Sequence, residues 1–120
     1  MPRLVPTPKA RDLPAGFEPM HLALTSGGFS LELLQPECLV GRHSHSDLRL
    51  PCPDVSRRHC RLFFADGAWH VGDLHSLNGV YVNDEKVKQC RLHVGDRVRL
   101  GGFTFVVLPP VAAIAPARAA

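Results

Sequence analysis

Between residues 20 and 108 the apolar residues occur in short runs, and Gly, Asn or Asp residues interrupt them. No window of about eleven residues in this region shows a clean helical period. The run at 60–65, for example, leads into Asp66-Gly67, a strong hairpin signal, and the apolar residues at 68–71 return from it. Many short strands separated by turn residues predict an all-β sandwich. Four aromatic side chains are expected in its core rather than stacked on a ligand: Phe63, Trp69, Phe103 and Phe105.

Length and proline placement divide the chain into one domain and two extensions. A length of 120 residues suits a single domain, and 45% hydrophobic with 21% charged residues excludes a fully disordered or fibrous chain. Five of the 11 prolines lie in the first twenty residues and three lie in the last twelve. We therefore expect a flexible Pro-rich arm at 1–20, the domain at 21–108 and a disordered Ala/Pro-rich tail at 109–120.

The sequence carries no visible targeting or metal-binding signal. No apolar run reaches about 18 residues, so no transmembrane helix is predicted, and the first residues lack the apolar stretch of a signal peptide. These observations favour a cytoplasmic protein. The 4 cysteines form no Cys-x-x-Cys pair, so we expect reduced thiols, no metal site and no cofactor.

The net charge of +3 is too small to indicate a nucleic-acid partner, but it is unevenly distributed. Residues 41–62 contain five arginines and two aspartates, a local excess of +3, together with three histidines. Turn residues in this segment place the charged side chains on loops, where binding sites are usually found. The alternative is that these arginines only keep a β-protein soluble and protect its sheet edges.

Three loop motifs stand in order along the chain: a Gly-Arg pair, a Ser-x-x-His motif and an Asn-Gly pair. They are Gly41-Arg42, Ser56-Arg57-Arg58-His59 and Asn78-Gly79. In this order and at these separations the motifs resemble the signature of forkhead-associated (FHA) domains. The segments at 47–51, 73–83 and 95–101 are also similar to that family, so the resemblance covers about 21–108. Any one dipeptide is weak evidence, whereas the ordered set is specific.

The resemblance implies an eleven-stranded β-sandwich of two antiparallel sheets, whose loops at one end bind phosphothreonine peptides. A phosphothreonine carries about −1.5 to −2 charges at pH 7 and three acceptor oxygens. Arg42 is then expected to supply a planar, permanently charged guanidinium, and Ser56 a hydroxyl donor. Arg57 matches the position that gives a second phosphate contact, and Asn78 matches the position that binds the peptide main chain. Ser76 completes the expected phosphothreonine-binding set.

The resemblance assigns other positions to bracing or to specificity. Gly41, His59 and Gly79 are expected to be structural, with His59 holding its loop by hydrogen bonds. Leu77 stands where many members carry a phosphate-binding threonine, so this site lacks one hydroxyl donor. Asp54 lies where members read the residue three past the phosphothreonine, and we expect a preference there for a basic side chain.

The implied function is a phosphothreonine-binding signalling adaptor downstream of a Ser/Thr kinase, with a phosphorylated protein as partner, no membrane partner and no enzymatic activity. A Ser56–His59 nucleophile is disfavoured because neither an orienting acid nor an oxyanion hole is marked. Two alternatives stay open: an FHA-fold docking domain with weak or lost phosphate binding, and nucleic-acid backbone binding through the basic loops. Thr7, between Pro6 and Pro8, offers a phosphorylation site through which the arm would occupy its own binding site or a neighbour's.

Overall fold

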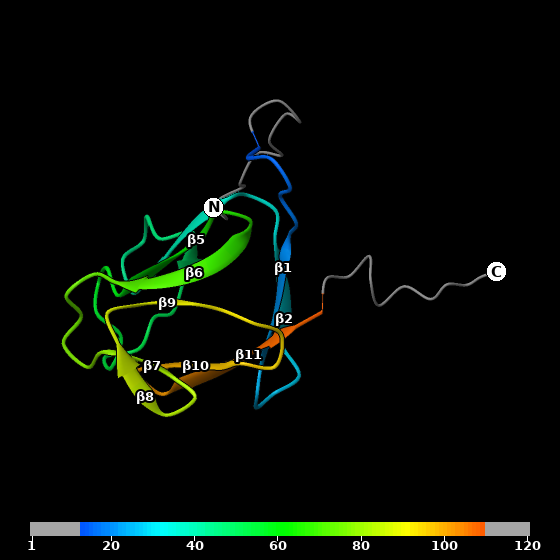
Figure 1. Cartoon of the computed structure of the whole chain (residues 1–120). Coiled ribbons are helices and arrows are strands. Elements are labelled where there is room, and N and C mark those ends of the chain that lie inside the picture. Colours follow the sequence, from blue (N-terminus) through cyan, green and yellow to red (C-terminus); the bar gives the residue numbers. More distant parts are fainter. Residues whose placement is uncertain (1–12, 110–120) are drawn as a thin grey trace.

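The computed structural model describes residues 13–109, which form a sandwich of two β-sheets (Figure 1). The strands are β1 Met20–Leu24, β2 Ser30–Leu33, β3 Glu37–Gly41, β4 Leu48–Arg49, β5 Cys60–Ala65, β6 Ala68–Asp73, β7 Val80–Val82, β8 Glu85–Val87, β9 Gln89–Arg91, β10 Arg97–Leu100 and β11 Phe103–Leu108. The six-stranded sheet has the order β2-β1-β11-β10-β7-β8, and the five-stranded sheet has the order β4-β3-β5-β6-β9. The predicted eleven-stranded all-β sandwich is therefore confirmed.

One strand pair departs from the expected antiparallel arrangement. β4 runs parallel to β3, with Val40 opposite Leu48 and Gly41 opposite Arg49. The Leu50 N–H continues this contact by donating to the Gly41 carbonyl at 2.8 Å. The other strand pairs within residues 13–109 are antiparallel.

The core between the sheets follows from the alternation of side chains along the strands. In β5 the residues are alternately buried and half-buried, because successive side chains point to opposite faces of a sheet. Trp69 and Phe105 are buried as predicted, and Phe103 packs half-buried against the core. The prediction for Phe63 is wrong, because this ring lies on the outer face of β5, stacked on His70 with centroids 5.2 Å apart.

Packing at the N-terminal side extends beyond the expected start of the domain at residue 21. The Phe17 ring meets the rings of Phe64 and Trp69 at centroid distances of 5.3 and 5.9 Å. The Trp69 indole N–H also donates to the Glu18 carbonyl at 2.7 Å. Thr7 and most of the predicted arm and tail lie outside the described residues.

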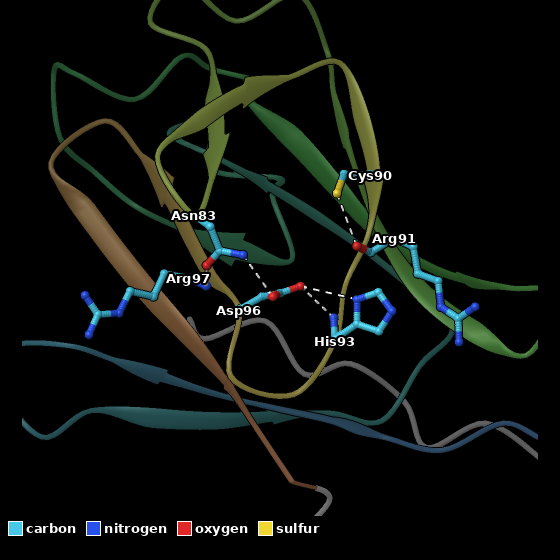
Figure 2. Close-up of polar contacts among 6 residues, drawn as sticks. All are labelled: Asn83, Cys90, Arg91, His93, Asp96 and Arg97. Atoms are coloured by element: carbon cyan, nitrogen blue, oxygen red, sulfur yellow. Dashed lines mark hydrogen bonds and ion pairs between the residues drawn. The ribbon is translucent and has the colours of Figure 1, made fainter.

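Two hairpin turns use residues in the left-handed region of backbone space. Asp66 and Gly67, at φ of 52° and 76°, form the turn that their sequence indicates between β5 and β6. Asn83 opens the turn between β7 and β8, and its side-chain amide donates to the Asp96 carboxylate at 3.0 Å (Figure 2). The His93 backbone N–H donates to the other oxygen of Asp96 at 2.8 Å. This network joins the β7–β8 turn to the loop that precedes β10.

The cysteines in the structure are free thiols. Burial, with a smaller contribution from the Asp47 charge, raises the pKa of Cys38 to about 12, and burial likewise raises the pKa of Cys60. Within residues 13–109 no group of three His, Cys, Asp or Glu side chains is placed to hold a metal ion. Over the same range no helix is long and apolar enough to cross a membrane.

Candidate functional site

Three loops meet at one end of the sandwich. The first loop, 42–47, follows β3; the second loop, 50–59, precedes β5; and the third loop, 74–79, joins β6 to β7. The first and second loops are joined where the Arg42 backbone N–H donates to the Ser56 carbonyl at 2.9 Å. We call these three loops together the loop end, and they carry the predicted site residues.

Gly41 permits the close approach of the first two loops. A Cβ atom at this position would lie 2.1 Å from the carbonyl oxygen of Arg57 and 2.8 Å from its carbonyl carbon. Both atoms belong to the backbone, so no side-chain rotation relieves the overlap. The Gly-Arg order therefore places Arg42 directly against the second loop.

The Arg42 guanidinium is oriented by a contact with the second loop. Its Nε–H donates to the carbonyl of Val55 at 2.9 Å, and Val55 itself is fully buried. This bond uses one of the five guanidinium N–H groups and leaves the four on the two Nη atoms. Arg42 thus presents a fixed fork of donors of the kind that binds carboxylates and phosphates in a bidentate manner.

Ser56 lies at the junction of the second and third loops. Its Oγ accepts a hydrogen bond from the Leu77 backbone N–H at 2.9 Å. A hydroxyl can accept two bonds and donate one, so this contact leaves the hydroxyl proton of Ser56 available to a ligand. Arg57 follows it directly and is exposed.

His59 braces the loop end from inside the fold. Its side chain is fully buried, and its Nδ1 accepts a hydrogen bond from the Ser56 backbone N–H at 3.0 Å. Nδ1 is therefore unprotonated, so Nε2 carries the hydrogen and donates to the Gly79 carbonyl at 2.8 Å. Since both ring nitrogens are engaged with the backbone, neither contacts the Ser56 hydroxyl as a general base would.

Ser76 is placed at the loop end, but its hydroxyl is used within the third loop. The Oγ donates to the carboxylate of Asp73 and accepts the Gly79 backbone N–H at 3.0 Å. Asp73 also accepts the Ser76 backbone N–H at 3.1 Å. Gly79 has a φ of 83°, in the left-handed region that favours glycine. These contacts fix the turn that carries Leu77 and Asn78.

The predicted peptide-contacting residues are exposed on the second and third loops. The Asn78 side-chain amide donates to the Asp54 carbonyl at 2.8 Å, which leaves its second N–H and its carbonyl oxygen for a ligand. The Leu77 side chain is 87% exposed. The Asp54 carboxylate is exposed beside the β10–β11 turn, where it would lie 3.2 Å from a Cβ at Gly102. The structure thus places these three side chains on neighbouring loops.

The ion pairs of the described residues lie away from the arginines of the first and second loops. Among the described residues the ion pairs are those of Arg61 with Glu37 and of His93 with Asp96. Neither pair involves an arginine of the first or second loop. The arginines of these loops therefore give this end of the sandwich a positive potential.

A family model for the FHA domain matches residues 38–101, which include all three loops. The chain belongs to the forkhead-associated family. The match to the family agrees with the motif resemblance in the sequence.

The chain matches FHA relatives over different shares of their length. The oxoglutarate dehydrogenase inhibitor of Corynebacterium efficiens is 38% identical over 105 residues, which is 87% of this chain and 74% of the relative. The glycogen accumulation regulator GarA of Mycolicibacterium smegmatis is 42% identical over 83 residues, 69% of this chain and 52% of GarA. This chain therefore spans about half the length of GarA.

A solved FHA domain matches the fold closely. It comes from a structural and functional analysis of phosphothreonine-dependent FHA domain interactions, with a TM-score of 0.70 and 33% identity. The match covers 76% of this chain and 96% of that domain. The FHA architecture of the described residues is thus supported by both sequence and coordinates.

Two supporting residues at the FHA loop end were missed by sequence reasoning. Val55 offers its carbonyl to Arg42, but an apolar residue in a loop gives no signal of that role. Asp73 holds the third loop by accepting hydrogen bonds from Ser76. The sequence signal for this role is the position of an aspartate three residues before a serine. Arg49, one of the arginines of the basic segment and of the nucleic-acid alternative, contacts the backbone of Arg42 through its side chain, a contact that the sequence does not indicate.

Proposed function

We propose that this FHA domain binds phosphothreonine in partner proteins and acts in the cytoplasm as a signalling adaptor downstream of a Ser/Thr kinase. One observation carries the proposal: Arg42 and Ser56, on adjoining loops of the loop end, are both fixed by hydrogen bonds, yet each keeps donors open. A phosphate needs such donors together with a positive field. The nearby arginines without ion-pair partners supply that field.

The energetic case rests on donors that are oriented before the ligand arrives. A hydrogen bond to a charged group contributes about 1.5–3 kcal/mol. Arg42 offers two Nη groups and Ser56 one hydroxyl proton, and exposed Arg57 adds a second guanidinium. Since the bond from Arg42 to Val55 already restrains the first side chain, little further ordering is required on binding.

The remaining predicted residues take different parts in the proposed site. Asn78, with one amide N–H and its carbonyl oxygen open, is suited to hydrogen bonds with an extended peptide main chain. We assign Ser76 to bracing the third loop instead of to the phosphate, because its proton is donated to Asp73. Leu77 contributes its backbone to Ser56 and directs its side chain to solvent.

The relatives support a regulatory role. One is named an inhibitor of oxoglutarate dehydrogenase and another a regulator of glycogen accumulation, and neither name describes a catalyst. The solved neighbour was studied for phosphothreonine-dependent interactions. A protein partner that carries the phosphate is therefore favoured over a small-molecule substrate.

The test compares phosphothreonine, phosphoserine and unphosphorylated peptide libraries with the wild type and Arg42→Ala. We expect phosphothreonine-selective binding, and a loss of about one to two decades of affinity in Arg42→Ala. Arg97→Ala, an exposed arginine of β10, is the matched control and should bind as the wild type does. Equal binding to all three libraries would overturn the proposal in favour of phosphate-independent docking. The affinity for an oligonucleotide, measured at two salt concentrations, tests the alternative that the basic loops bind the nucleic-acid backbone.

Peptide specificity is assigned to Asp54, whose backbone carbonyl accepts the Asn78 amide and whose carboxylate is exposed beside the β10–β11 turn. We expect a basic side chain to be favoured three residues past the phosphothreonine, and Asp54→Lys to reverse that preference. A peptide array in which the wild type favours acidic residues at this position contradicts the assignment.

The N-terminal arm is proposed as a ligand in cis or in trans after phosphorylation of Thr7, a residue outside the described part of the chain. The loop end supports this proposal only in that it provides a binding site for a phosphorylated segment. Unchanged phosphorylation and unchanged self-association in a Thr7→Ala variant would contradict the proposal.

A further inference from the structure

Arg49 stands on β4, the edge strand next to the end of β3. Its backbone is held on both sides, because half-buried Leu48 packs against the core and buried Leu50 donates its N–H to the Gly41 carbonyl at 2.8 Å. In the parallel register Arg49 lies opposite Gly41, the residue before Arg42. An exposed arginine is thereby fixed beside the proposed phosphate site.

The Arg49 side chain is turned toward that site. Its Nε–H donates to the backbone carbonyl of Arg42 at 3.2 Å. Four N–H groups on the two Nη atoms remain, as in Arg42. Among residues 13–109, no carboxylate forms an ion pair with Arg49. The Arg49 guanidinium is therefore held against the backbone of Arg42, and both arginine side chains carry open donors.

The strand order gives the order of the groups across the loop end. In the sheet β4-β3-β5-β6-β9, Arg49 lies on β4, Arg42 follows the neighbouring strand β3, and Leu77 lies in the loop after β6. Arg49 is thus on one side of β3, where Arg42 begins its loop, and the loop of Leu77 is on the other. An extended peptide rises about 3.3 Å per residue, so a side chain two or three residues from the phosphothreonine falls within reach of Arg49.

We propose that Arg49 forms a second anion subsite, which selects phosphothreonine peptides with an additional anionic side chain two or three residues away, on the side opposite Leu77. This inference rests on the proposed function and deepens it by naming the class of peptide. The anion is a carboxylate or a second phosphate, both of which match a guanidinium fork. The basic preference assigned to Asp54 applies to a different position of the peptide.

The experiment measures the affinity of phosphothreonine peptides with alanine flanks, in which one flanking position at a time is replaced by glutamate or by phosphoserine. For the wild type we expect a gain of about five-fold for glutamate at one position, and a larger gain for phosphoserine there because its charge is greater. Arg49→Gln should abolish both gains. Arg49→Glu should transfer the preference at that position to lysine.

Two matched variants separate a subsite from a diffuse positive field. Arg58→Gln removes a nearby exposed charge from the second loop, and Arg97→Gln removes one from β10, and both should keep the gain. The inference is overturned if acidic flanks give the wild type no gain, if the gain survives in Arg49→Gln, or if Arg58→Gln abolishes it equally. If the wild type does not bind any phosphothreonine peptide, the proposed function itself fails and the subsite fails with it.

Discussion

At the scale of single residues, the loop end depends on Gly41, because the backbone of the second loop occupies the space that a side chain would need there. Gly41 and Gly72 are both buried strand glycines, but their surroundings differ. A Cβ on Gly41 would overlap the Arg57 backbone at 2.1 Å, whereas a Cβ on Gly72 would meet the Phe63 ring at an ordinary 3.6 Å. The burial of a glycine alone therefore does not predict its tolerance to substitution.

Gly41→Ala is expected to lower the free energy of unfolding by more than about 2 kcal/mol, because the overlap is with backbone that cannot rotate away. Gly72→Ala should change stability by less than about 1 kcal/mol. Denaturant unfolding of the two variants measures both values. Similar losses in both variants would show that the close approach of Arg57 has no special cost.

At the scale of elements, side chains in turns hold neighbouring strands together. The β7–β8 turn reaches the loop before β10 through Asn83 and Asp96, as Figure 2 shows. Burial alone would raise the pKa of Asp96. Hydrogen bonds from the Asn83 amide and the His93 backbone, with the His93 charge, outweigh that effect and hold the pKa below its ordinary value.

A lowered pKa predicts the sign of a pH dependence. The ionised form of Asp96 is favoured in the folded state, so its contribution is present at pH 7 and is lost as pH falls below about 4, through the folded pKa. The stability difference between the wild type and Asp96→Asn should shrink over that range. Asp66→Asn, in an exposed turn, is the control for loss of a carboxylate. A difference that is the same at pH 7 and pH 3 contradicts the role of ionised Asp96.

At the scale of the whole molecule, the sandwich is closed at its N-terminal side by residues that precede β1. Phe17 packs on Phe64 and Trp69, and the Glu18 carbonyl accepts the indole N–H. This group lies outside the domain boundary expected from proline content. Proline-rich sequence thus marks the limit of regular structure, while ring packing continues past it.

Phe17→Ala is expected to lower the free energy of unfolding by about 2 kcal/mol, since a half-buried aromatic ring and its contacts are removed. Phe29→Ala is the matched control, because that ring is 49% exposed at the β1–β2 hairpin. Thermal unfolding of the two variants gives the comparison. Equal melting temperatures would place the domain boundary after Phe17.

The sequence alone indicated much of this site, because its motifs are local. The turn residues Asp66 and Gly67 indicate their hairpin because their own backbone preferences favour the turn, whatever the distant contacts. Phe63 was assigned wrongly because alternation shows that faces differ without showing which face is inside. Leu62 and Phe64, on the inward face, are as apolar as their neighbour.

By itself the sequence determined the all-β class, the turns and the residues that belong to the loop end, because each depends on near neighbours in the chain. Only the tertiary structure decided which donors stay open. The Nε of Arg42 is used by Val55, 13 residues away, and the Oγ of Ser56 accepts an N–H from Leu77, 21 residues away. The hydroxyl group of Ser76, in contrast, donates its hydrogen bond to Asp73. Hydrogen-bonding capacity is shared among groups that meet in space, so the donors left for a ligand follow from the assembled loops.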